Sequence, residues 1–245
     1  MIVQACLNGA RRSGFHPRLP LNVEAMARDG ASCVAAGATE LHIHPRGSHG
    51  QESLSAVDET ILAVRSTCPD TLVGVSTGAW IENDAEQTRN AITGWNVLPD
   101  YASVNLSEAD APAVMKLLQQ RGVGIEAGIA SLADAERFLG FRGHGRVFRI
   151  LIEIDEQDLA AAWKMADDIA ALLDRAGVRR PILLHGFDAT VWPFVAVAHQ
   201  RQWSTRVGLE DGKHLPNGTI ASGNAALVAA AVAIYANRAA RWDAD

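Results

Sequence analysis

Two histidines at alternate positions, His42 and His44, are the strongest chemical signal in the sequence. They end a short apolar run, 39–44, of the kind that forms a β-strand. Because side chains alternate across a strand, positions i and i+2 point the same way. A lone buried histidine is more often a hydrogen-bonded core residue, but two imidazoles on one face can share a metal ion. The pair therefore predicts a metal site.

A catalytic metal needs a third protein ligand and an open position for substrate. Glu210 is the best candidate, because it follows the last strand-like run, 204–209. Histidine and carboxylate donors favour zinc, although manganese, cobalt, nickel and iron accept the same donor types. Asp211 is placed to act as a base if the chain turns after Glu210. A plain surface turn at Asp211-Gly212 is an equally good interpretation.

Further polar residues stand where other strand-like runs end. These are Asn8, Ser76, Thr77, Ser103, Asn105, Glu126, Glu153 and His185. A barrel of parallel strands brings the ends of its strands to one mouth, where barrel enzymes place their chemistry. The alternative is that strands simply end where polar residues begin, but this explains only a few of so many positions. We therefore expect one polar cluster.

The same alternation predicts charges inside the barrel. Arg206 shares a strand face with Glu210, and Glu40 shares one with the two histidines. If the histidines face inward, Arg206 and Glu40 do so too, and a buried charge needs a partner. We predict that Arg206 pairs with Glu40 or a neighbouring carboxylate; an arginine that extends outward between helices is the alternative.

The elements that must position these residues alternate between strand and helix along the whole chain. Segments of helical periodicity separate eight short apolar runs, at 2–8, 39–44, 72–76, 101–106, 123–126, 147–154, 182–185 and 204–209. Runs buried on both faces indicate a parallel sheet. The glycine-rich phosphate loop of a doubly wound sheet is missing after the first run. We predict an α/β fold, a (β/α)8 TIM barrel, as a single domain over 1–245.

The composition limits which binding partners and which cell compartment we expect for this protein. The net charge of −6 gives no basic footprint for nucleic acid. The most apolar stretch, 225–236, is too short to span a membrane. Three cysteines without metal-type spacing suit a reducing cytoplasm, and the first residues resemble a strand more than a signal peptide. We expect a cytoplasmic protein that binds neither nucleic acid nor membrane.

The sequence resembles the β-keto acid cleavage enzymes, which include the 3-keto-5-aminohexanoate cleavage enzyme of lysine fermentation. The similarity spans nearly the whole chain. The stretches that carry it are Leu41-His-Ile-His-Pro-Arg46, Val75-Ser-Thr-Gly78, Ala102-Ser-Val-Asn105 and Arg206-Val-Gly-Leu-Glu-Asp211. The histidine pair alone is only moderately specific for this family. Together with the Arg206–Asp211 pattern, it makes the resemblance strong.

The resemblance implies zinc on His42, His44 and Glu210, and a Claisen and retro-Claisen exchange. A β-keto acid and acetyl-CoA, a coenzyme A thioester, would give acetoacetate and a new acyl-CoA. Asp211, with Arg206 nearby, would take the C2 proton, and the enzyme would be a homo-oligomer. The predicted substrate-binding residues are Asn8, Ser76, Thr77, Gly78, Ser103, Asn105 and Glu126. Among them, Glu126 matches the position that meets an amino group in the amino-substrate enzyme.

The chain departs from the family pattern in two places. Gly47 follows Arg46 where the family has an aspartate, and the stretch between Asn105 and Glu126 is short. Two alternatives therefore stay open. One is a divalent-metal barrel lyase or aldolase that acts through an enolate without acetyl-CoA. The other is a barrel without catalysis that binds a ligand or partner around a structural metal.

Overall fold

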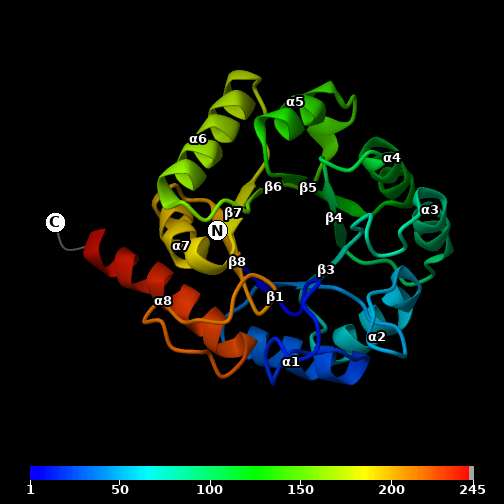
Figure 1. Ribbon diagram of the computed structural model, residues 1–245, viewed down its shortest axis with the longest axis horizontal. Coiled ribbons are helices and arrows are strands. Elements are labelled where there is room, and N and C mark those ends of the chain that lie inside the picture. The colour runs from blue at the N-terminus through cyan, green and yellow to red at the C-terminus, as the bar shows by residue number, and fades with distance from the viewer. Residues whose placement is uncertain (243–245) are drawn as a thin grey trace.

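The computed structural model describes residues 1–242, which form a closed barrel of parallel strands with helices outside it (Figure 1). Each strand hydrogen-bonds to the next one in the chain, and β8 closes the ring on β1. The strands are β1 (Val3–Cys6), β2 (Glu40–Ile43), β3 (Leu72–Ser76), β4 (Tyr101–Asn105), β5 (Gly124–Ile129), β6 (Arg149–Ile154), β7 (Ile182–Gly186) and β8 (Ser204–Val207). The predicted (β/α)8 barrel is confirmed.

One long helix follows each strand. The helices are α1 (Val23–Ala35), α2 (Val57–Thr67), α3 (Ala85–Gly94), α4 (Ala111–Arg121), α5 (Leu132–Gly140), α6 (Leu159–Arg175), α7 (Val191–Gln200) and α8 (Asn224–Trp242), with short 3-10 helices η1 (Leu54–Ala56), η2 (His144–Arg146) and η3 (Asp188–Thr190). Asn22 caps α1 by accepting the N–H of Ala25 at 2.8 Å. Within residues 1–242, no helix is both long and apolar enough to cross a lipid bilayer.

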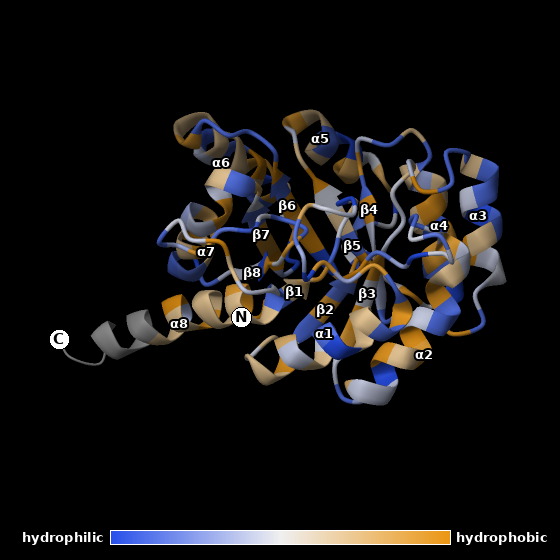
Figure 2. Ribbon diagram, turned by 60° about the horizontal axis from the view of Figure 1, so that its bottom comes forward, coloured by the Kyte–Doolittle hydropathy of each residue, from blue (hydrophilic) through white to orange (hydrophobic). Residues whose placement is uncertain are grey.

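Alternate residues of each strand divide between two environments. On β2, Leu41 and Ile43 point outward and are fully buried in the hydrophobic core between the strands and the helices. Each such side chain contributes about 1.5–3 kcal/mol on burial. The helices carry hydrophobic and hydrophilic residues side by side, as expected when one face packs on the barrel (Figure 2). The residues between, Glu40 and His42, are left to fill the interior of the barrel.

Several strand ends differ from the sequence prediction, and two of these differences affect predicted site residues. β5 continues to Ile129, because Ala127 and Gly128 keep pairing with β6, so Glu126 lies within the strand and not at its end. β8 ends at Val207, earlier than predicted. A Cβ at Gly208 would lie 1.8 Å from the carbonyl oxygen of Cys6, so only glycine allows the chain to turn here against β1.

The interior at the amino-terminal ends of the strands holds a group of charged and polar side chains, which we call the deep cluster: Gln4, Glu40, Tyr101, Glu126 and Arg149. The Arg149 guanidinium contacts the Glu40 carboxylate and lies 2.6 Å from Glu126 Oε2. Gln4 donates to Tyr101 Oη at 2.8 Å and to Glu126 at 3.2 Å. Glu40 is therefore not the carboxylate that pairs with Arg206, and the other predicted option, a neighbouring carboxylate, is the one observed. Arg149, from the opposite side of the barrel, is the partner of Glu40.

Candidate active site

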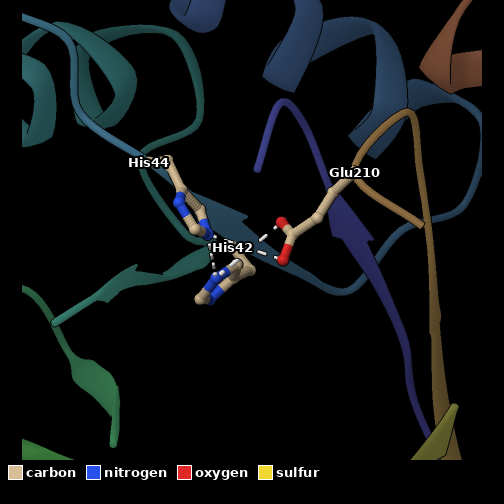
Figure 3. Close-up of side chains that lie close together, drawn as sticks. All are labelled: His42, His44 and Glu210. Atoms are coloured by element: carbon tan, nitrogen blue, oxygen red, sulfur yellow. Dashed lines mark hydrogen bonds and ion pairs between the residues drawn. The ribbon is translucent and has the colours of Figure 1, made fainter. Parts of the chain in front are cut away.

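His42, His44 and Glu210 meet at the carboxyl-terminal mouth of the barrel, with their polar atoms pointing toward one another (Figure 3). The Nε2 atoms of the two histidines are 3.2 Å apart. His44 Nε2 lies 3.5 Å from Glu210 Oε1, and His42 Nε2 lies 3.9 Å from Glu210 Oε2. Both imidazoles are buried, and the Glu210 side chain is 10% exposed.

Two glycines bring Glu210 to the histidines across the seam between β8 and β1. Gly208 lets the chain after β8 turn tightly, and the N–H of Glu210 then donates to Cys6 carbonyl oxygen at 3.4 Å. Cys6 in turn is paired with His42 on β2. A Cβ at Gly9, whose φ is +53°, would lie 2.4 Å from the Glu210 side chain. The loop after β1 can therefore pack directly against this carboxylate.

The three donors fit a divalent cation. Metal–ligand bonds of about 2.0–2.1 Å in a tetrahedral zinc site separate neighbouring donors by roughly 3.3–3.4 Å, and the two shortest donor separations here are 3.2 and 3.5 Å. Burial lowers the pKa of His42 to about 3, so its imidazole is neutral and can offer a lone pair. Glu210 Oε2 has no hydrogen-bond partner within residues 1–242, which leaves it free to bind a cation.

Charge around the site favours the ionised form of Glu210. Burial alone would raise its pKa, but the Arg206 guanidinium and the His44 ring outweigh burial and hold the pKa well below its usual range. Arg206 Nη2 lies 2.8 Å from Glu210 Oε1, 3.1 Å from Glu153 Oε2 and 3.3 Å from Asp211 Oδ1. Arg206 thus points into the barrel, as predicted from its parity, and its partners are these three carboxylates.

His185 joins two of those carboxylates behind the candidate metal site. Its Nε2 lies 2.9 Å from Glu153 Oε2, and its Nδ1 lies 3.4 Å from Asp211 Oδ1. Asp211 is fully buried, and its Oδ2 has no hydrogen-bond partner in the described part of the chain. One oxygen of Asp211 is therefore held in place by Arg206 and His185 while the other has none of these contacts.

A cavity of about 590 Å³ opens at the mouth; Glu153 lines it, whereas the fully buried Asp211 is not one of its lining residues. Several predicted site residues line it: His42, His44, Ser76, Ser103, Asn105, Arg206 and Glu210. The small polar residues come from β3 and β4, across the barrel from Arg206 on β8. The cavity therefore has a neutral polar wall facing the candidate metal site and its arginine.

The other predicted site residues lie next to this cavity without lining it. Asn8 donates to His44 carbonyl oxygen at 2.9 Å and accepts the His44 N–H, so it holds the backbone of a metal-ligand candidate. Thr77 donates to Ser103 carbonyl oxygen at 2.7 Å. Gly78 lies against the Trp80 ring, where a Cβ would be 2.3 Å away. Glu126 belongs to the deep cluster and does not reach the cavity.

The structure adds residues that sequence reasoning missed. Those lining the cavity are Ala10, Arg11, Trp80, Asp155, Gln157, Phe187 and Asp188. A further one, Glu52, contacts His44 from the loop after β2. Most of these residues lie in loops beyond the strand ends, where no sequence periodicity indicates which way a side chain points. The glycines around 47–50 were the available signal, because they mark the loop that brings Glu52 back to the barrel.

Fold and site together define a (β/α)8 barrel with a candidate metal centre of two histidines and one glutamate at its mouth. The model of the beta-keto acid cleavage enzyme family matches residues 1–241, so the chain belongs to that family. It is 25% identical to the 3-keto-5-aminohexanoate cleavage enzyme of Fusobacterium nucleatum subsp. nucleatum, over 93% of this chain and 88% of that protein. The protein of the same name from Acetoanaerobium sticklandii is 22% identical, over 93% and 89%.

Solved structures show the same fold. The apo structure of ObcA superposes with a TM-score of 0.76 at 15% identity, over 91% of this chain and 63% of ObcA. A ternary complex of ObcA with a C4-CoA adduct and oxalate gives a TM-score of 0.77 at 16% identity, over 91% and 65%. The chain thus spans less than two thirds of ObcA. A 3-hexulose-6-phosphate synthase gives 0.56 at 18% identity, over 96% and 99%.

Proposed function

We propose that this protein is a zinc-dependent enzyme that exchanges acyl groups between a β-keto acid and acetyl-CoA. The products are acetoacetate and a new acyl-CoA. The observation that carries the proposal is the convergence of His42, His44 and Glu210 at the mouth of a barrel from the beta-keto acid cleavage enzyme family. The named relatives act, by their names, on a β-keto acid with an amino group. An ObcA structure holds a CoA adduct in the same fold.

His42, His44 and Glu210 would hold the zinc, which supplies a Lewis acid for the carboxylate and keto oxygens of the substrate. The other residues bind and orient. Ser76, Ser103 and Asn105 line the wall opposite Arg206 and present hydroxyl and amide groups to those oxygens. Arg206 supplies a fixed positive charge beside the site, which favours an anionic substrate.

Asp211 is the proposed base that removes the C2 proton of the β-keto acid. Arg206 and His185 contact only its Oδ1, so its Oδ2 is left to accept a proton. The resulting C2 carbanion attacks the acetyl carbonyl and releases CoA thiolate. The thiolate then attacks the original keto carbon, and the C2–C3 bond breaks to release the acyl-CoA. The carbanion left at C2 takes back the proton held by Asp211 and becomes acetoacetate.

The test is to incubate the zinc-loaded protein with a panel of β-keto acids, with and without acetyl-CoA. We expect acetoacetate and a new acyl-CoA to form in equal amounts only when acetyl-CoA is present. Removing zinc with a chelator should stop the reaction, and adding zinc back should restore it. Cleavage that proceeds equally well without a thioester would overturn the exchange and identify a metal-dependent lyase.

A further inference from the structure

The candidate metal site has a carboxylate behind it that comes from a loop. Glu52 Oε1 contacts His44 Nδ1, the ring nitrogen that faces away from His42 and Glu210. The other oxygen, Oε2, accepts the indole N–H of Trp80 at 3.0 Å. Glu52 is not part of the three-residue group that could hold a cation, and its side chain is 11% exposed. Each carboxylate oxygen of Glu52 therefore has a partner, His44 for Oε1 and Trp80 for Oε2.

The contact decides which nitrogen of His44 carries a proton. An ionised carboxylate can only accept hydrogen bonds, so the Nδ1 beside Glu52 must be the N–H nitrogen. The Nε2 of a neutral ring then keeps its lone pair, and this atom lies 3.2 Å from His42 Nε2 and 3.5 Å from Glu210 Oε1. Glu52 thus favours the tautomer whose lone pair faces the other two donors.

The loop that carries Glu52 is closed on itself. An antiparallel bridge joins Arg46 to Glu52. Gly47 N–H donates to Gln51 carbonyl oxygen at 2.8 Å, and Ser53 N–H donates to Pro45 carbonyl oxygen at 3.0 Å. These bonds return the chain to the strand end, so that Glu52 reaches a histidine eight residues before it.

Two further contacts hold this loop against the rest of the mouth. The Arg46 guanidinium donates to the backbone carbonyls of Gly9 and Arg11, in the loop after β1 that packs on Glu210. The Trp80 ring stacks on the His44 ring, with centroids 6.5 Å apart and planes 21° from parallel. Arg46 holds the loop in place, and the Trp80 indole N–H holds the Glu52 carboxylate. Glu52 can therefore fix the orientation of the His44 ring.

We propose that Glu52 is a positioning residue for the metal site: it orients His44 and makes Nε2 the better donor, with Trp80 holding the second oxygen of Glu52. The proposal rests on the zinc site of the proposed function. Outer carboxylates of this kind typically change metal affinity by about 10- to 100-fold. The expected effect is therefore on retention of the metal, and it can be measured without any substrate.

The experiment measures the zinc affinity and the rate of zinc release to a chelator for the wild type, Glu52→Gln and Glu52→Ala. We expect about 10-fold weaker binding for Glu52→Gln, whose amide oxygen still accepts from Nδ1, and about 100-fold for Glu52→Ala. Trp80→Phe keeps an aromatic ring beside His44 but loses the indole N–H, so it should fall between wild type and Glu52→Gln.

The matched control is Glu82→Gln. Glu82 also fixes this segment through a carboxylate, by accepting the N–H of Leu54 at 2.8 Å, but it forms no hydrogen bond or ion pair with a histidine among residues 1–242. We expect its zinc affinity to stay within about twofold of the wild type. Circular dichroism of each variant, with and without zinc, separates loss of the ligand contact from loss of the fold.

Histidine-labelled protein gives a second readout that a purely structural role would not move. In the zinc-loaded wild type, the Nδ1–H resonance of His44 should appear far downfield, and Glu52→Gln should shift it upfield while other histidines keep their resonances. Zinc affinity and Nδ1–H resonance unchanged in both Glu52 variants would overturn the proposal. A wild type that binds no zinc would remove the metal centre itself, whereas failure of the acetyl-CoA reaction alone would leave the role of Glu52 intact.

Discussion

The interior of the barrel contains buried charges at two levels, and the two levels differ in access. In the deep cluster, Arg149 sits between Glu40 and Glu126, and the rings of Tyr101 and Phe148 lie 4.8 and 4.6 Å from its guanidinium carbon. At the mouth, similar residue types border a cavity of about 590 Å³. The deep charges are enclosed by one another and by aromatic rings, so they can only stabilise the fold. At the mouth, Arg206, Glu153 and Glu210 line the cavity, so they can meet a ligand.

The contents of the two levels also differ. The deep cluster has one arginine and two carboxylates, and burial raises the pKa of Glu40 in spite of Arg149. The mouth adds imidazole rings, of which that of His42 is kept neutral by burial, and a carboxylate, Glu210, whose pKa is lowered. Lone pairs and a permanent negative charge are what a divalent cation needs. The comparison teaches that buried charge alone does not mark a site; donors that converge beside a cavity do.

Asp211→Asn gives the largest expected effect, and it acts on the mouth alone. It removes a base and no metal ligand, so zinc content should stay normal while kcat falls by about 10²- to 10⁴-fold. Zinc per chain and steady-state kinetics measure the two quantities. Asp168→Asn, on α6, where the side chain is 39% exposed, serves as the control. A near-normal kcat for Asp211→Asn would exclude Asp211 from the mechanism.

Arg149→Met tests the deep cluster. Removing one partner of a buried ion pair costs about 3–5 kcal/mol of unfolding free energy, because the carboxylates are left without compensation. Urea unfolding should show this loss, and the triple variant Arg149→Met, Glu40→Gln, Glu126→Gln should recover part of it. Zinc affinity of the folded protein should not change. A folded Arg149→Met protein that loses zinc would show that the two levels act as one site.

His42→Ala tests the mouth level, because it removes a metal-ligand candidate and leaves the deep cluster unchanged. Zinc sites with four ligands bind with about 10–16 kcal/mol, or roughly 2.5–4 kcal/mol per ligand, so loss of His42 should weaken zinc binding by about 60- to 700-fold. His44→Ala should do at least as much. The metal-free protein should still unfold cooperatively. His49→Ala, at an exposed loop histidine, is the control, and full zinc retention in His42→Ala would refute its assignment as a ligand.

The pH dependence of zinc binding is the smallest effect and separates the two histidines. Burial lowers the pKa of His44, but the carboxylates of Glu210 and Glu52 outweigh burial and raise it to about 9. Below that pH zinc must displace one proton from His44, so its affinity should rise about tenfold per pH unit and level off near pH 9. His42, with a pKa of about 3, has no proton to release. Chelator competition at several pH values measures the slope, and a flat profile would contradict the assignment.

The same pKa shift sets how the stability of the metal-free protein depends on pH. A histidine with a raised pKa in the folded state stabilises it fully below the unfolded pKa of about 6.5. That contribution is lost as pH rises through about 9. Thermal unfolding without metal should therefore show a lower Tm at pH 9 than at pH 7, and His44→Ala should remove this component.

The sequence predicted what strand periodicity controls. Alternation along β2 and β8 placed His42, His44 and Arg206 inside the barrel, and the closed ring brings Glu210 within reach, two strands from β2. Periodicity does not give contacts across the barrel, so it left the partner of Arg206 open between Glu40 and a neighbouring carboxylate. It also did not identify Arg149 as the partner of Glu40. It also does not describe loops, so Glu52 was missed.

The site joins parts of the chain that are far apart in sequence. The histidines come from the second strand, whereas Glu210 follows the last one and reaches them only after β8 has paired with β1. An open sheet would offer two donors, and only the closed ring offers three. A ligand that binds only the closed state shifts the equilibrium toward it by mass action. A cation bound to these three side chains would therefore stabilise the closed barrel relative to partly folded chains.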